Sequence, residues 1–162
     1  MVISDLFAEG RYRVVHKLGS GGSPTIWLAR ERGEFGGPVT IKGMRAEVSS
    51  NNSVEEVPEL SVPLSVSSHG PGANIQTPKD ISWKFGPNGS HLCLIYRLAG
   101  PNILSMSFSP GRVAGSRHLQ KDPAKKVAKQ LARAVELVHA RGFVLALSME
   151  VRDNFCARKI SS

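Results

Sequence analysis

A glycine-rich segment between two β-prone runs constrains the fold of this chain more than any other feature. Residues 12–18 read YRVVHKL and residues 25–30 read TIWLAR, and Gly19, Gly21 and Gly22 lie between them. Both runs are rich in β-branched and aromatic residues and lack helical periodicity, so they predict the two strands of a hairpin. In a phosphate loop ending in Gly-Lys-Ser/Thr and in a dinucleotide-binding turn, a helix follows the glycines. Here a strand is predicted after the glycines, so the segment is neither of these two loop types.

Three further runs predict strands. Residues 39–44 read VTIKGM, and ISWKF (81–85) and HLCLIYRL (91–98) flank the turn sequence GPNG. The predicted fold class is therefore α+β, with a five-stranded antiparallel sheet. Residues 47–80 are weaker, because SSNNS and SSHGPG are typical of loops. Between them we expect at most a short, degenerate helix, since Pro58 and Pro63 limit it to little more than a turn.

The clearest helix is predicted to start at Asp122 and to end near Arg141. Asp122 is a candidate N-cap, Pro123 suits the first helical position, and Gly142 suits a left-handed residue that stops the helix. One apolar stripe at helical spacing is formed by Ala124, Val127, Ala128, Leu131, Val135 and Val138. Residues 105–120 are rich in Ser, Gly and Arg and predict an exposed connection.

Charge and composition narrow the classes of function. The chain has 162 residues and a net charge of +8, with its basic residues spread along the sequence. They are not interleaved with stacking aromatics, which favours a solvated basic face over nucleic-acid binding. Cys93 and Cys156 lack metal-ligand or disulfide-framework spacing, and we expect Cys93 to be a buried small hydrophobe. No run has membrane-spanning length and the start lacks a signal-peptide pattern, so we expect a soluble protein of the cytoplasm or nucleus with no membrane partner.

Lys42, on the next predicted strand, indicates a possible role for the glycine segment in binding phosphate groups. Glycines let backbone N–H groups approach phosphate oxygens, and a lysine on the next strand adds a point charge beside the same oxygens. A glycine loop between two strands, followed by Val-Ala-Ile-Lys, is the arrangement that covers ATP in protein kinases. Here the lysine motif reads Val39-Thr40-Ile41-Lys42. A mobile turn and an ordinary edge-strand lysine remain the alternative.

Taken in order, the motifs resemble the N-terminal lobe of a eukaryotic serine/threonine protein kinase, nearest to fungal relatives of the serine/arginine-rich-protein kinases. The resemblance covers about residues 9–144 and is carried by YRVVHKLGSGGSPTIWLARE, VTIK, GPNGSHLCLIYRLAGPN and ARAVELVHARGFV. It implies an N-lobe with hinge over residues 1–104, a connection over 105–121, one C-lobe-type helix over 122–144 and a tail outside the family pattern over 145–162.

The resemblance also implies an ATP site. Its residues would be Gly19, Ser20, Gly21 and Gly22 in the loop over the phosphates, Lys42 on the α and β phosphates, Ile26 above the adenine, Tyr96 at the gatekeeper position, and Arg97 and Ala99 at the hinge. Glu59 would be the partner of Lys42, with Glu56 as second choice. Two departures weaken the pattern: Pro24 removes an N–H from the loop, and Thr40 replaces a small alanine near the adenine.

A third departure concerns catalysis. After Val144 the family continues into a loop whose aspartate accepts the proton of the substrate, and later residues hold magnesium. Residues 145–162, LALSMEVRDNFCARKISS, do not contain this pattern. The segment Val151-Arg152-Asp153-Asn154 has Val in place of His, and Arg158 stands where the family has Asn. We therefore assign no catalytic residue and no metal ligand, and we expect this chain alone not to hold Mg²⁺.

Three functions follow from these observations. The first is a truncated kinase-like domain that binds nucleotide, with ATP as its cofactor, but does not transfer phosphate. The second is a non-catalytic, pseudokinase-like module that binds a protein partner through its basic surface or through the exposed apolar face of the helix at 122–144. The remaining alternative is that the chain is a gene-model fragment and has no function of its own.

Overall fold

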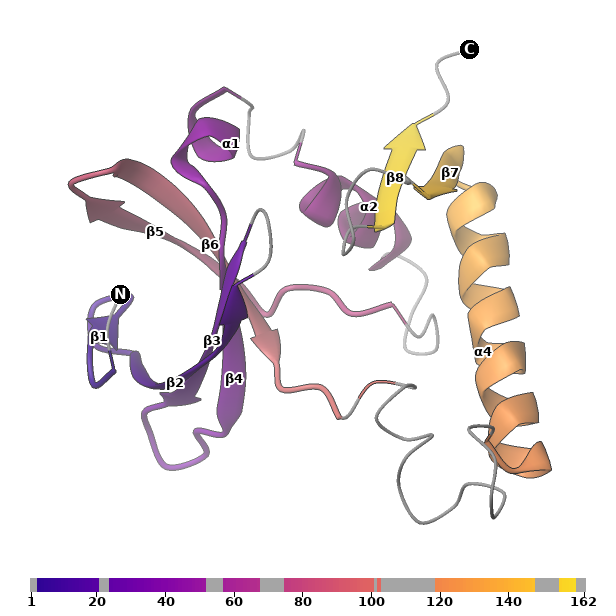
Figure 1. The fold of residues 1–162 in the computed structure, drawn as a ribbon, viewed down its shortest axis with the longest axis horizontal. Coiled ribbons are helices and arrows are strands. Elements are labelled where there is room, and N and C mark those ends of the chain that lie inside the picture. Colours follow the sequence, from indigo (N-terminus) through magenta and orange to yellow (C-terminus); the bar gives the residue numbers. More distant parts are fainter. Residues whose placement is uncertain are drawn as a thin grey trace.

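The computed structural model describes residues 3–20, 24–51, 57–67, 75–100, 102, 119–147 and 155–159. Its main body is an antiparallel sheet with the strand order β1-β2-β3-β4-β6-β5 (Figure 1). The strands of this sheet are β1 (Leu6–Phe7), β2 (Tyr12–Ser20), β3 (Thr25–Glu31), β4 (Pro38–Gly43), β5 (Asp80–Gly86) and β6 (Gly89–Arg97). The helices are α1 (Ala46–Asn51), α2 (Pro58–Ser67) and α4 (Lys121–His139), and a second, two-stranded sheet pairs β7 (Phe143–Leu147) with β8 (Phe155–Lys159).

The α+β class agrees with the sequence prediction, but the strand count differs. The main sheet has six strands because the two-residue strand β1 pairs with β2, through Leu6 opposite Arg13 and Phe7 opposite Tyr12. Two residues are too short for an alternating pattern, so the sequence offered no signal for β1. Phe7 is nevertheless buried. Its burial against the sheet explains why this short segment is held in place.

Alternation along the strands divides the main sheet into two faces. On one face Trp27, Ile41 and Ile95 lie directly opposite one another across β3, β4 and β6. We call this the outer face; its buried cluster consists of Phe7, Tyr12, Ala29, Val39, Ile41, Cys93 and Ile95. On the other, which we call the helix face, Met44, Leu92 and Leu94 pack with Val57 and Leu60 at the start of α2. Cys93 is buried, as expected from its apolar neighbours.

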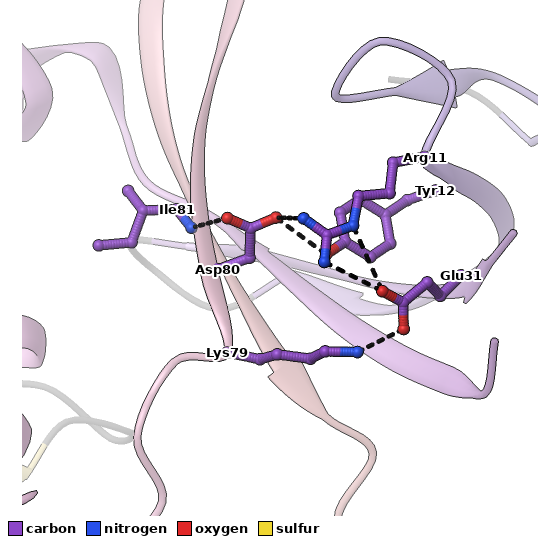
Figure 2. A network of polar contacts seen from close by, with 6 residues as sticks. All are labelled: Arg11, Tyr12, Glu31, Lys79, Asp80 and Ile81. Carbon is purple, nitrogen blue, oxygen red and sulfur yellow. Dashed lines mark hydrogen bonds and ion pairs between the residues drawn. The ribbon is translucent and has the colours of Figure 1, made fainter. Parts of the chain in front are cut away.

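The sheet is strongly curved, and on its outer face a polar network joins the start of β2 to the start of β5 (Figure 2). Three strands separate β2 from β5 in the sheet order, yet the Tyr12 hydroxyl donates to Asp80 Oδ2 at 2.9 Å. Arg11 donates to the same carboxylate at 2.9 Å and pairs with Glu31 at 3.2 Å. Lys79 also pairs with Glu31. The two cations and two carboxylates of this network therefore balance.

Helix α2 is longer than predicted. It runs for ten residues with Pro63 inside it, where the sequence indicated little more than a turn. Pro58 occupies the first position, where a missing N–H costs nothing. Pro63 costs about 3 kcal/mol in a helix interior, but Leu60 and Val66 are fully buried, and each such side chain contributes about 1.5–3 kcal/mol. Tertiary burial therefore outweighs the proline.

A second helix was not predicted at all. Helix α1 includes Ser49 and Asn51, which the sequence assigned to a loop. The Ser49 hydroxyl donates to the carbonyl of Arg45 at 2.9 Å and accepts the N–H of Leu92 at 2.9 Å. Ser49 thus forms hydrogen bonds both within α1 and to β6. A residue type that locally favours loops here joins a helix to the sheet.

Helix α4 starts at Lys121 with Gln120 as its N-cap, so the assignment of Asp122 as N-cap was wrong. The helix ends at His139, and Gly142 has a φ of +74°, the left-handed conformation expected for it. The chain then enters β7 at Phe143, so the helix ends before residue 144, the bound that the resemblance implies. The hairpin of β7 and β8 lies partly in the segment outside the family pattern.

The apolar stripe of α4 is only partly covered. Val138 is buried with Val62 and Val66 of α2 and Phe143 of β7, whereas Leu131 is 60% exposed. The connection predicted over 105–121 falls mostly outside the described residues. Within the part of the chain that the structure describes, no helix is both long and apolar enough to cross a membrane.

Candidate functional site

Lys42 stands on the helix face of β4, in the middle of the sheet. It lies directly opposite Ile26 of β3 and Leu94 of β6. One step along the same strands, Thr40 lies opposite Leu28 and Tyr96. Because directly opposed residues share a face, the register brings Ile26, Lys42 and Tyr96 onto one surface.

Glu59 reaches Lys42 from α2. Lys42 Nζ lies 3.3 Å from Glu59 Oε1, and the two side chains are 22% and 31% exposed. Glu59 lies in the first turn of α2, where the helix dipole favours a carboxylate. The pair therefore joins β4 to α2 while remaining open to solvent. Glu56 lies outside the described residues.

Tyr96 packs against the buried cluster beneath the pair. Burial, and secondarily the negative charge of Glu59, raises the pKa of Tyr96 to about 12. The phenol therefore stays neutral at physiological pH. Lys42, Glu59 and Tyr96 thus form a compact polar group at the border of an apolar cluster.

The glycine segment approaches this group from the end of β2. Gly19 lies opposite Ile26, and Ser20 opposite Thr25, so both lie beside the strand that pairs with Lys42. A Cβ placed on Gly19 would meet no atom within 4 Å, so packing does not require a glycine there. Gly21 and Gly22 fall outside the described residues. Pro24 lies directly before β3.

The two predicted hinge residues lie at the end of β6. The Arg97 carbonyl accepts a hydrogen bond from Gln76 Nε2 at 2.6 Å, so one of its lone pairs is already used. The next N–H, that of Leu98, points to the carbonyl of Pro38 at 3.4 Å. Ala99 is exposed, and its backbone groups make no hydrogen bond to the described residues.

Nothing in the described ranges gathers three His, Cys, Asp or Glu side chains into a possible metal site. A pocket is present on the outer face, on the opposite side of the sheet from Lys42. Of its lining residues the sequence analysis singled out only Cys93, as a buried small hydrophobe. The period-two alternation of side chains along a strand could have assigned the strand residues of the pocket to one face of each strand. Their convergence depends on the strand order 2-3-4-6-5, which no local pattern encodes.

Comparison with known proteins adds sequence relatives. The chain is 32% identical over 139 residues to the protein kinase dsk1 of Schizosaccharomyces pombe, which covers 85% of this chain. It is 26% identical over 144 residues to a serine/threonine protein kinase of Aspergillus fumigatus, and 24% identical over 135 residues to the serine/threonine-protein kinase SRPK of Physarum polycephalum. No protein-family model matches the chain.

The chain is similar to one part of serine/threonine protein kinases. This confirms the resemblance read from the motifs, including its fungal relatives. The matched part is 25% of dsk1, 34% of the Aspergillus kinase and 30% of SRPK. The chain thus spans about a quarter to a third of the length of these relatives, so their whole activity does not transfer directly to it.

Proposed function

We propose that this chain is a nucleotide-binding, kinase-like lobe of the kind found in kinases of serine/arginine-rich proteins. The observation that carries the proposal is the cluster of Ile26, Lys42 and Tyr96 on one face, with Glu59 at 3.3 Å from the lysine. Lys42 would contact the α and β phosphates of ATP. Residues Gly19 to Gly22 would cover the phosphates from above, and Ile26 would lie over the adenine.

The chemistry of Lys42 supports this role. A lysine held by one carboxylate keeps its charge and its position, yet two of its three N–H donors stay available for phosphate oxygens. The surrounding apolar cluster lowers the local dielectric and strengthens such contacts. Pro24 removes one donor near the loop and Thr40 adds bulk beside Tyr96, so we expect weak binding.

Calorimetric titration of residues 1–162 with ATP tests nucleotide binding. Lys42→Ala should weaken ATP at least about tenfold, the loss expected when a charge-assisted phosphate contact is removed. Lys125→Ala, which removes an exposed lysine from α4, is the matched control and should leave the affinity unchanged. Equal binding by Lys42→Ala and the unaltered chain would contradict the proposal.

We further propose that residues 1–162 by themselves do not transfer phosphate. Transfer needs a carboxylate that accepts the substrate proton and ligands for magnesium, and no residue of this chain was assigned to either task. Incubation with Mg-ATP and a serine/arginine-rich peptide should leave the peptide unmodified by mass spectrometry. Phosphorylation that Lys42→Ala abolishes would overturn this part.

A non-catalytic binding module is the second candidate, favoured by the exposed apolar residues of α4. Leu131 is 60% exposed on a helix whose stripe is buried only near Val138. A partner protein that covers this stripe would remove that apolar surface from water. Association that Leu131→Asp abolishes, measured by analytical ultracentrifugation of mixtures with candidate partners, would favour this role.

A further inference from the structure

A pocket of about 260 Å³ lies on the outer face of the main sheet. Its walls come from both ends of the strand order. Lys17 of β2 lies opposite Trp27 of β3, and on the far side Lys84 of β5 lies opposite His91 of β6. The pocket is therefore built by segments that are distant in sequence and meet only in the curled sheet.

Gly43 forms the floor between these two rows. It lies opposite Thr25 on one side and Cys93 on the other, and both of these residues also line the pocket. A Cβ added to Gly43 would stand 3.8 Å from the Thr25 carbonyl oxygen and 3.9 Å from Cys93 Sγ, which is ordinary contact. The hollow exists because the central strand has no side chain at this position.

The lining is strongly basic. Lys17, Arg45 and Lys84 contribute cationic side chains to it, His91 also lines it, and no Asp or Glu does. By contrast, Lys42 has a carboxylate within 4 Å, as do both cations of the polar network. Across the described ranges, neither Lys17 nor Lys84 forms an ion pair.

The contacts of Lys17 and His91 show which polar atoms of the pocket remain available to a ligand. Lys17 Nζ lies 5.9 Å from the centre of the Trp27 ring, so the ring holds the ammonium without neutralising it. His91 Nδ1 lies 3.0 Å from the carbonyl oxygen of Met44, which can only accept. Nδ1 therefore carries the proton in that bond, and Nε2 of the neutral ring is an acceptor, so His91 could meet only a protonated oxygen of a phosphate group.

We propose that this pocket binds a phosphate monoester group, carried by a phosphorylated peptide side chain or present as free phosphate. Like charges gathered around one hollow repel one another, and an anion bound between them relieves this repulsion. A phosphate dianion offers three oxygens, which suits several cations and the Thr25 hydroxyl, whereas a carboxylate offers two oxygens and one charge. The site is separate from the Lys42 face, and it does not depend on the nucleotide proposal.

Trp27 fluorescence gives a direct readout, in a Trp83→Phe background that removes the other tryptophan of the chain. The probes are inorganic phosphate and a serine-phosphorylated peptide, with the unphosphorylated peptide as control. We expect a saturable fluorescence change with a phosphorylated probe and none with the control peptide. Lys17→Ala and Lys84→Ala should each weaken binding roughly tenfold.

Matched variants separate charge from folding. Lys17→Arg should retain binding, and Lys125→Ala on α4 should match the Trp83→Phe parent. Gly43→Val keeps every charge but fills the floor of the pocket, so it should abolish the fluorescence change while circular dichroism shows an intact sheet. Binding of inorganic phosphate would show that the group alone suffices, and binding of the phosphopeptide only would identify a phosphorylated side chain as the ligand.

Two results would overturn the proposal. One is the absence of saturable binding by either phosphorylated probe. The other is binding that Lys17→Ala, Lys84→Ala and Gly43→Val leave unchanged. Neither result bears on ATP binding, which is measured separately with Lys42→Ala.

Discussion

Two regions of this molecule place a tyrosine beside a carboxylate, and they differ in how completely their polar groups are paired. In the outer network the Tyr12 hydroxyl donates to Asp80 at 2.9 Å, and Arg11 and Lys79 complete two ion-pair links to Glu31 (Figure 2). On the helix face, Tyr96 lies near Glu59, and its hydroxyl makes no hydrogen bond to a described residue. There a single ion pair joins Lys42 to Glu59.

We interpret the difference as that between a structural role for the outer network and the proposed binding role for the helix face. The outer network is closed and balanced, so its groups have no need of a further ligand, and it fixes the start of β2 against β5. The pair on the helix face holds one carboxylate against one lysine and leaves donors of the lysine free. Such incomplete pairing is what the proposed nucleotide site requires, since free donors of Lys42 are needed to bind phosphate oxygens.

The largest effect is expected at Tyr12, which is fully buried. Tyr12→Ala removes an aromatic ring from the core beneath the network and should lower the free energy of unfolding by about 3–5 kcal/mol. Tyr12→Phe keeps the ring and loses only the hydrogen bond to Asp80, so about 1 kcal/mol should be lost. Urea denaturation measures both. Equal losses would show that the hydroxyl, not the ring, holds the curl of the sheet.

An intermediate effect is expected for Tyr96 at alkaline pH. Its pKa is raised to about 12 from an ordinary value of 10.0, so the unfolded chain releases this proton first. The stabilising contribution is fully present below pH 10 and is lost as pH rises toward 12. Tyr96→Phe should therefore retain about 1 kcal/mol more of its neutral-pH stability than the unaltered chain at pH 11.5. Denaturant titration at pH 7 and 11.5 checks this, and a difference already present at pH 7 would point to packing instead.

Low pH should destabilise the outer network, whereas high pH acts on Tyr96 of the helix face. The hydrogen bond from Lys79, supported by Arg11, lowers the pKa of Glu31 below its ordinary value of 4.5. Its stabilisation is thus complete above pH 4.5 and is lost as pH falls further, while the unfolded chain gains the proton first. Glu31→Gln should lower the melting temperature at pH 7 and reduce the further drop between pH 4.5 and 3. Thermal scans at these pH values suffice, and an unchanged acid profile would contradict the network.

The smallest effect on stability is expected at Glu59. The pair with Lys42 is partly exposed, so Glu59→Gln should change the free energy of unfolding by less than about 1 kcal/mol. The same change should weaken ATP measurably, because Lys42 loses the group that positions it. A large loss of stability with unaltered ATP affinity would reverse the assignment of roles between the two regions.

Much of the sheet could be predicted from sequence, but the helices of residues 46–67 could not. Alternation of apolar and polar residues, together with β-branched residues, predicts the strands, as in residues 12–18 and 39–44. Pro63 and the serines of α1 carry the opposite local signal. Helix α2 forms because Leu60 and Val66 find a buried environment, and that environment is supplied by β6 and α4, which lie far away in the chain.

The candidate site divides in the same way. Lys42 was found from its motif, whereas the pocket around Gly43 was not, since Lys17 and Lys84 are 67 residues apart in sequence and meet only across a curled sheet. The residue pattern by itself determined the α+β class, which runs form most of the strands, and the kinase-like motifs, because alternation and glycine placement are local properties. The resemblance named Glu59 as the partner of Lys42, but only the tertiary structure decided how the two side chains meet and which cations share the outer face, because charges converge through strand pairing and burial, to which the whole chain contributes.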